Sequence, residues 1–197
     1  MKDRLRVGVL VSGQGSNLQA LISASRAPGY PAQVVIVCAN RAAPALDHAR
    51  SAGIETAAFL RANFPSRDAR DEAMAAALKA RSVELVVCAG YDSILTPGFT
   101  GQFLGRILNV HPSLLPAFKG SMDAVDRALA AGVSETGCTV HLVTDDVDAG
   151  PILGQRRVPV LSGDTPARLH ARIKAEEHRL LPEIVRQIAE HEPSLRR

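Results

Sequence analysis

The sequence has few of the features that mark disulfide-bonded, zinc-binding or membrane proteins. It contains three cysteines, an odd number with no C-x-x-C pair, so neither a disulfide framework nor a zinc site is expected. Each of them (Cys38, Cys88 and Cys138) lies in an apolar run, which is typical of reduced, buried thiols in a cytoplasmic protein. No apolar stretch approaches the roughly 18 residues that a membrane span requires, so no membrane partner is expected.

The chain also lacks a strong charge of either sign. Its formal net charge is +3, which is too small to indicate nucleic acid as a partner and is compatible with a small anionic substrate. Apolar residues make up 46% of the 197 residues and charged residues 22%, as in one ordinary globular domain. We expect this domain at 1–190 and a flexible tail at 191–197. The first strand follows Met1 closely, which argues against a signal peptide. We expect a cytoplasmic protein that is a monomer or a homodimer.

Buried runs rich in β-branched residues alternate with helical periodicity over the first half of the chain. This alternation predicts an α/β fold, with βαβ units and a Rossmann-like, mostly parallel twisted sheet that has helices on both faces. The sequence predicts strands at 6–11, 34–38, 55–58 (an edge strand), 85–88 and 106–110. It predicts helices at 18–25, 45–52 and 66–81, the last with Ser66 as its N-cap.

Connections become short after residue 110, and short connections favour antiparallel pairing. We expect antiparallel C-terminal strands at 139–143, 152–155 and 158–160, and a helix at 124–131. Residues 165–189 form one or two amphipathic helices, interrupted near Pro182. Ligands should bind at the carboxyl ends of the parallel strands of this single domain.

Asn109 and His111 close the apolar strand at 106–110. Side chains two apart on a strand point to the same side, so an amide and an imidazole emerge together at the mouth of the sheet. Pro112 restricts His111 to an extended backbone conformation. An amide N–H beside a protonated ring N–H suits a developing oxyanion, as in acyl transfer. The alternative is a strand-end Asn and a hydrogen-bonded His with no chemical role.

Asp148 ends an acidic loop and precedes Ala149-Gly150-Pro151, which predicts a constrained turn. A carboxylate near His111 would favour the imidazolium form and orient its ring. No Asp, Glu or His stands nearby at a ligand spacing, and hard cations need more oxygens, so no metal is expected. An ordinary solvated acidic loop is the alternative.

A glycine-rich turn, with Gly13, Gly15, Ser16 and Asn17, separates the first strand from the first helix. Glycines permit close approach, and the helix N-terminus offers free N–H groups to an anion. The turn lacks the last glycine of a dinucleotide fingerprint and the lysine of a P-loop, which favours a phosphorylated sugar over a dinucleotide or ATP. The alternative is an ordinary turn with a Ser or Asn cap.

Five motifs, in order from the first strand to the last helix, resemble those of the phosphoribosylglycinamide formyltransferase family. The resemblance covers essentially the whole chain, and HPSLLP with the downstream DVDAGPI is its specific part. The motifs are Ser12–Leu18, Asn109–Pro116, Phe118–Ser121, Thr136–His141 and Asp146–Ile152.

The resemblance implies an enzyme of de novo purine biosynthesis that transfers the formyl group of 10-formyltetrahydrofolate, its cosubstrate, to the amine of glycinamide ribonucleotide. Asn109 and His111 would stabilise the tetrahedral oxyanion, and Asp148 would assist proton transfer. The substrate's own amine is the nucleophile, which explains why the motifs offer no activated Ser or Cys.

The resemblance also assigns substrate-binding residues. Gly15, Ser16 and Asn17 would hold the ribonucleotide phosphate, and Glu177 would hydrogen-bond the ribose, although a helix-surface charge is the alternative for Glu177. Lys119, on a loop facing the ligand, would help to hold phosphate, and a solvated loop lysine is at least as good an interpretation.

The cofactor side is assigned in the same way. Residues 89–97 correspond to the family's pterin-binding loop. Arg67 corresponds to an arginine near the folate and substrate side, with a first-turn helix charge as the alternative. Asp92 and Ser93 depart from the Met and Arg that are common there, and 122–125 departs from a histidine-containing stretch. The cofactor-binding residues expected are Arg67, Tyr91, Asp92, Ser93, Ile94, Leu95 and Asp145.

Three other functions share parts of this pattern. A formyltetrahydrofolate hydrolase would carry an additional N-terminal domain, and a methionyl-tRNA formyltransferase a further C-terminal domain with a basic surface. A non-catalytic nucleotide- or folate-binding protein would not need Asn109, His111 and Asp148 together. We therefore expect the glycinamide ribonucleotide reaction.

Overall fold

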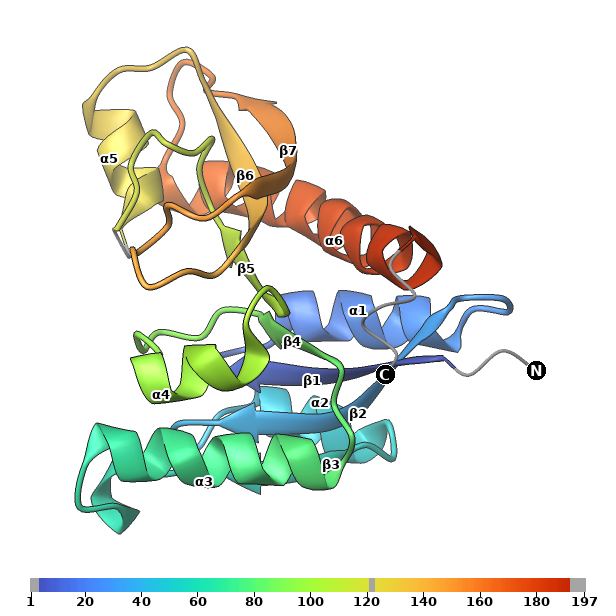
Figure 1. The fold of residues 1–197 in the computed structure, drawn as a ribbon. Coiled ribbons are helices and arrows are strands. Elements are labelled where there is room, and N and C mark those ends of the chain that lie inside the picture. The colour runs from blue at the N-terminus through green and yellow to red at the C-terminus, as the bar shows by residue number, and fades with distance from the viewer. Residues whose placement is uncertain (1–3, 121–122, 192–197) are drawn as a thin grey trace.

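The apolar runs of the sequence pair as strands of one seven-stranded sheet in a computed structural model, which describes residues 4–120 and 123–191 (Figure 1). The spatial order is β3-β2-β1-β4-β5-β6-β7, parallel as far as β5 and antiparallel from β5 to β7. The predicted α/β sheet with antiparallel C-terminal strands is thus confirmed. The strands are β1 (Leu5–Val11), β2 (Ala32–Ala39), β3 (Glu55–Ala58), β4 (Leu85–Cys88), β5 (Ile107–His111), β6 (Glu135–Leu142) and β7 (Ile152–Pro159).

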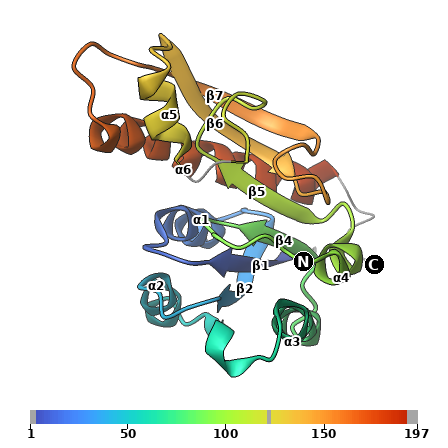
Figure 2. The ribbon, with the colours of Figure 1, turned by 90° about the vertical axis from the view of Figure 1, so that its left-hand side faces the viewer.

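Helices cover both faces of the sheet because the strands are buried on both sides. Figure 2 shows α1 and α2 on one side of β1 and β2, and α3 and α4 on the other. Ser66 caps α3 as predicted, since its side chain accepts a hydrogen bond from the Ala69 N–H. The helices are α1 (Ser16–Arg26), α2 (Ala45–Ser51), α3 (Arg67–Ala80), α4 (Pro97–Thr100), α5 (Ala124–Ala130) and α6 (Pro166–His191), with 3₁₀ turns η1 (Arg61–Asn63) and η2 (Gly101–Phe103).

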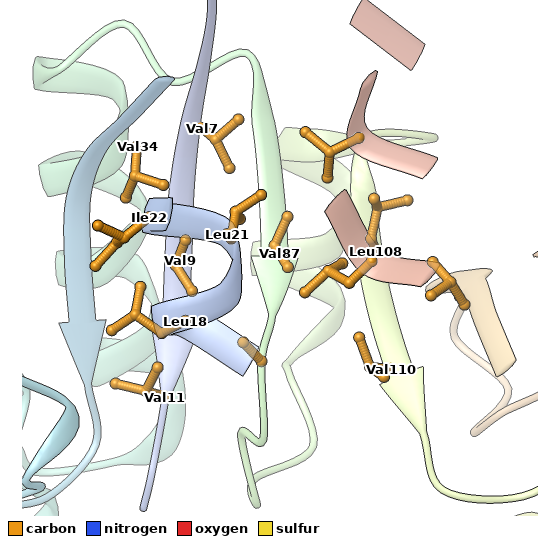
Figure 3. Packing of buried hydrophobic residues seen from close by; sticks show 14 of the residues in the cluster. Val7, Val9, Val11, Leu18, Leu21, Ile22, Val34, Val87, Leu108 and Val110 are labelled. Atoms are coloured by element: carbon orange, nitrogen blue, oxygen red, sulfur yellow. The ribbon is translucent and has the colours of Figure 1, made fainter. Parts of the chain in front are cut away.

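Strand alternation divides the core into two layers. Alternate valines of β1, at 7, 9 and 11, pack with Leu18, Leu21 and Ile22 of α1 (Figure 3). Leu10 points the other way, toward Met74 and Leu78 of α3. Each such side chain contributes roughly 1.5–3 kcal/mol on burial, so the two layers fix the strand ends that carry the site.

The chain reverses its direction of travel across the sheet between β1 and β4. From β1 it moves outward to β2 and β3, and then returns to β4 on the other side of β1. In open α/β sheets the ligand crevice lies at this switch point, outside the carboxyl ends of the strands. The loops that follow β1 and β4 therefore lie where ligands should bind.

Four predicted segments differ clearly in extent. The segments 152–155 and 158–160 form one continuous strand, β7, and β6 begins four residues before the predicted strand. The predicted interruption near Pro182 is wrong, because α6 continues from Pro166 to His191 with Pro182 inside it. The buried Leu180, Leu181, Ile184 and Val185 hold the helix on both sides of the proline. Packing thus outweighs the lost backbone hydrogen bond.

The predicted tail at 191–197 begins inside this helix. His191 is its last residue, and 192–197 lie outside the described residues. Within 4–120 and 123–191, no helix has the length and apolar character needed to cross a membrane.

Candidate active site

The side chains of Asn109, His111 and Asp148 come together at the carboxyl end of β5. His111 Nδ1 lies 3.3 Å from Asp148 Oδ2, and Asn109 Nδ2 donates to Asp148 Oδ1 over 3.3 Å. Asn109 and His111 are two apart on β5, so the strand itself directs both side chains toward the loop that carries Asp148. The structure therefore joins the three residues that the sequence singled out as catalytic.

His141 belongs to the same cluster, although sequence reasoning assigned it no role. It pairs directly with Asn109 across the antiparallel β5–β6 ladder. Its Nε2 lies 3.2 Å from Asn109 Nδ2 and 3.4 Å from Asp148 Oδ1, and its Nδ1 lies 2.9 Å from the Leu142 carbonyl oxygen. A histidine in the otherwise apolar run 138–143 was the available signal, and only the strand register shows what it faces.

The turn that carries Asp148 has no room for a different backbone. Asp148 has φ +51°, in the left-handed region that few L-residues adopt. A Cβ added to Gly150 would lie 1.9 Å from the Leu142 carbonyl oxygen, so this position accepts only glycine. The Leu142 N–H donates to the Pro151 carbonyl and closes the turn against β6. Asp148 is thus held by the backbone as well as by its side-chain contacts.

Electrostatics keep Asp148 ionised. Burial alone would raise its pKa, but hydrogen bonds from His141 and the Gly120 N–H, together with the charge of His111, lower it to about 2. The Gly120 N–H lies 2.9 Å from Asp148 Oδ2. The carboxylate therefore remains an acceptor throughout the neutral range.

The pKa of His111 results from opposing effects that the sequence did not predict. Burial lowers its pKa, and the Asp148 carboxylate and the Phe118 carbonyl oppose that shift without overcoming it. Both ring nitrogens nevertheless face oxygen acceptors, since Nε2 lies 3.1 Å from the Phe118 carbonyl oxygen. Burial thus lowers the pKa of His111 overall, while the Asp148 carboxylate acts in the expected direction and favours the charged ring.

Asn17 and Glu177, predicted separately as substrate-binding residues, are in direct contact. Asn17 lies in the first turn of α1 and donates through Nδ2 to Glu177 Oε2 over 2.8 Å. Glu177 is 4% exposed on α6, and burial raises its pKa, although the Asn17 hydrogen bond and Lys174 oppose this. Asn17 Oδ1 is buried without a hydrogen-bond partner among the described residues. A free acceptor beside a carboxyl group can bind ligand hydroxyls.

The glycine turn has the geometry expected of an anion-binding turn. Gly15 caps α1 with φ +78°, and it has no side chain to occupy the N–H groups of the first turn. A Cβ at this position would lie 2.6 Å from Ala45 Cβ, so the turn packs closely against the start of α2. Ser16 begins the helix itself. Backbone N–H groups at this helix end are available to a phosphate.

The expected cofactor-side residues lie mainly in the loop between β4 and α4. Ile94 is exposed and Leu95 is buried, so the loop presents one apolar side chain outward and anchors the next. Asp145 accepts a hydrogen bond from Thr100 Oγ1 over 3.1 Å, which joins the acidic loop to α4. The residues of this loop that were predicted as cofactor-binding are Tyr91, Asp92, Ser93, Ile94 and Leu95.

Two predicted residues have exposed side chains, although Lys119 lies between Phe118 and Gly120, whose backbone groups contact His111 and Asp148. Arg67, the first residue of α3, and Lys119 are both exposed. Of the 122–125 departure, residue 122 lies outside the described residues, as does Ser121 of the third motif. Among residues 4–120 and 123–191, no group of three or more His, Cys, Asp or Glu side chains is arranged to hold a metal ion.

Comparison with known proteins finds one family over most of the chain. A family model described as formyl transferase matches residues 5–185. The chain is 48% identical to a phosphoribosylglycinamide formyltransferase of Mycobacterium tuberculosis, over 94% of this chain and 86% of that protein. It is 47% identical to the human trifunctional purine biosynthetic protein adenosine-3, over 95% of this chain, but spans only about a fifth (19%) of that longer protein.

The fold agrees equally well with a solved structure. The glycinamide ribonucleotide transformylase 1 of Symbiobacterium toebii superposes with a TM-score of 0.93 at 48% identity, covering 95% of this chain and 88% of that one.

Proposed function

Because the chain belongs to the formyl transferase family, we propose that it is a phosphoribosylglycinamide formyltransferase of purine biosynthesis. In this proposal the formyl group of 10-formyltetrahydrofolate passes to the amine of glycinamide ribonucleotide. The convergence of Asn109, His111 and Asp148 within hydrogen-bond reach at the end of β5 is the observation that carries the proposal. A cytoplasmic location and a monomer or homodimer stay predictions.

The reaction begins when the substrate amine attacks the formyl carbon. The carbonyl double bond opens, and its oxygen becomes an anion in a tetrahedral intermediate. Asn109 Nδ2 and His111 Nε2 are the N–H donors proposed to stabilise this charge. An oxyanion would compete with the Phe118 carbonyl for His111 Nε2. Removal of one such donor typically lowers turnover by a factor of about 100 to 1000.

Proton transfer completes the reaction. The attacking nitrogen must lose a proton, and N10 of the folate must gain one before the carbon–nitrogen bond breaks. Asp148 is ionised, so it can orient His111 through Nδ1 and favour the charged ring as negative charge develops. His141, on the other carboxylate oxygen, completes a relay in which Asp148 lies between two imidazoles.

Substrate binding is assigned to the switch point of the sheet. The N-terminus of α1 would hold the phosphate, and the Asn17–Glu177 pair would bind ribose hydroxyls. The loop after β4 would hold the folate between its exposed Ile94 and its backbone groups. The two substrates would thus meet in front of β5, in an orientation that favours attack.

A formyl-transfer assay with glycinamide ribonucleotide as acceptor tests this proposal. We expect formylated ribonucleotide and tetrahydrofolate in equal amounts, and turnover that His111→Ala and Asp148→Asn both abolish almost completely. Formate released into water without the ribonucleotide would indicate a hydrolase instead. Binding of both ligands without product would indicate a non-catalytic binding protein.

A further inference from the structure

Hydrogen bonds join the loops that follow β1 and β4 at the switch point of the sheet. The Ser12 N–H donates to the Gly90 carbonyl over 3.1 Å, and the Asp92 N–H donates to Ser12 Oγ over 3.0 Å. Ser12 is 7% exposed and directly precedes the glycine turn of α1. The loop proposed for folate and the turn proposed for phosphate are therefore in direct contact.

The Asp92 carboxylate extends this connection to the turn after β2. Asn40 Nδ2 donates to Asp92 Oδ1 over 2.8 Å, and the Arg41 guanidinium pairs with Asp92 Oδ2. Burial raises the pKa of Asp92, but the hydrogen bonds from Asn40 and Ser12 and the charge of Arg41 outweigh it, so the pKa is lowered. Asp92, Ser12, Asn40 and Arg41 form what we call the clasp, and it ties together the carboxyl ends of three neighbouring strands, β2, β1 and β4.

The clasp reaches the phosphate turn by a second route. The turn that begins at Asn40 leads into α2, whose first residue, Ala45, donates its N–H to the Gly13 carbonyl over 3.2 Å. Ala45 is also the residue against which Gly15 packs so closely that a Cβ there would lie 2.6 Å from Ala45 Cβ. The turn that carries Arg41 is therefore connected to the phosphate turn by a hydrogen bond and by close packing.

The opposite side of the folate loop is held by a buried and less adjustable set of bonds. Asp71, fully buried on α3, accepts from Arg70 Nη2 over 2.9 Å and from the Thr96 N–H over 3.0 Å. Arg70 Nη2 also donates to Ser93 Oγ over 3.1 Å. The Asp92 side chain is 21% exposed and that of Arg41 57%. The loop thus has one fixed attachment and one, the clasp, that can rearrange.

We propose that Asp92 is a positioning residue that couples the two substrate sites, so that binding of the phosphorylated amine favours binding of the folate. The inference rests on the proposed function, because it takes 89–97 as the folate loop and the turn of α1 as the phosphate site. An isolated exposed ion pair contributes little. Asp92 differs because its carboxylate has two side-chain partners while its backbone N–H holds Ser12, so either ligand that orders one loop also orders the other.

Binding measured with an unreactive pair of ligands tests the coupling. Tetrahydrofolate has no formyl group, so glycinamide ribonucleotide and tetrahydrofolate form a complex that cannot react. We expect the ribonucleotide at saturation to tighten tetrahydrofolate binding to the native protein by about 5-fold or more, measured by calorimetry. In Asp92→Asn and in Arg41→Gln this factor should fall close to 1, and Arg41→Lys should restore part of it.

Two further measurements separate a positioning role from a structural one. In Arg41→Gln the KM for the folate should rise by about 5-fold with kcat nearly unchanged, because Arg41 belongs to the clasp and does not touch the reacting atoms. The Asp92→Asn, Arg41→Gln double variant should show no larger loss of coupling than either single variant. Asp47→Asn, which removes an Asp–Arg pair from the exposed face of α2, is the matched control and should leave the coupling factor unchanged.

Arg41 is an exposed side chain, so Arg41→Gln keeps the test informative if Asp92→Asn does not fold. A coupling factor that stays at the native value in both variants, or that is 1 in the native protein, overturns the inference. If the native protein makes formylated ribonucleotide, the proposed function survives that result. If the native protein makes none, the proposed function fails, and the inference fails with it.

Discussion

The parallel and antiparallel parts of the sheet hold their functional groups in different ways. In the parallel part, the groups follow the strands, in turns and helix starts, and they meet partners far away in sequence, as Asn17 meets Glu177. In the antiparallel β5–β6 pair, Asn109 and His141 lie within strands and face each other by register. Loops adjust when ligands bind, whereas strand positions are fixed by their neighbours. Binding should therefore depend on the first part and turnover on the second.

Among these changes, His111→Ala in the antiparallel part should lower turnover the most. Loss of one donor to the oxyanion should lower kcat by about 100- to 1000-fold. The Kd for glycinamide ribonucleotide should change by no more than about 2-fold, because the ribonucleotide site lies elsewhere. Steady-state kinetics and calorimetry measure the two quantities, with His191→Ala at the exposed end of α6 as control. A variant that retained native kcat would exclude His111 from the chemistry.

His141→Gln should have the next largest effect. Glutamine removes the imidazole that lies beside both Asp148 and Asn109. A hydrogen bond to a charged group is worth about 1.5–3 kcal/mol, so kcat should fall by about 10- to 100-fold with little change in either KM. A rise in the ribonucleotide KM instead would mean that the strand positions also serve binding, contrary to the division described above.

Glu177→Gln should weaken ribonucleotide binding in the parallel part and leave the rate of the chemical step unchanged. The amide keeps an acceptor for Asn17 Nδ2 but removes a carboxylate that would bind ribose hydroxyls. The ribonucleotide KM should rise by about tenfold with kcat unchanged. Steady-state kinetics over one range of ribonucleotide concentrations gives both KM and kcat for the variant and the native protein. A fall in kcat at saturating ribonucleotide would contradict it.

The smallest effect concerns stability in acid. The pKa of Asp148 is lowered to about 2 in the folded protein, so its contribution is fully present above the unfolded value of about 4 and is lost as pH falls toward 2. Between pH 7 and pH 3 this amounts to about 1 kcal/mol, or roughly 3 °C in Tm. Asp148→Asn should therefore lose less Tm over that interval than the native protein does. Calorimetric scans at both pH values decide it, and equal losses would contradict the assignment.

Local sequence patterns predicted the structural features that depend on residues close together in the chain. The apolar runs at 6–11 and 106–110 located β1 and β5, and the spacing of Asn109 and His111 placed both on one side of β5. Pro182 misled because its effect is local, while the burial of Leu180 and Ile184 that keeps α6 intact depends on the sheet beneath it. Packing of this kind cannot be predicted without the fold.

Partners distant in sequence were beyond prediction for the same reason. Asp92 stood out only as a departure from the pattern of a resembling family, and nothing near it indicated Asn40, 52 residues away. His141 lay inside a quoted motif, but its function depends on the β5–β6 register. The sequence therefore singled out residues in the loops and did not indicate what each one touches.

The turn at Gly150 limits how this protein can be redesigned. A screen that randomises the acidic loop to alter acceptor choice should vary the exposed Ala149 freely and leave position 150 untouched, because any β-carbon there collides with the Leu142 carbonyl at 1.9 Å. Libraries that ignore this would consist mostly of inactive clones. Their failure would report a displaced carboxylate and not an unfavourable acceptor.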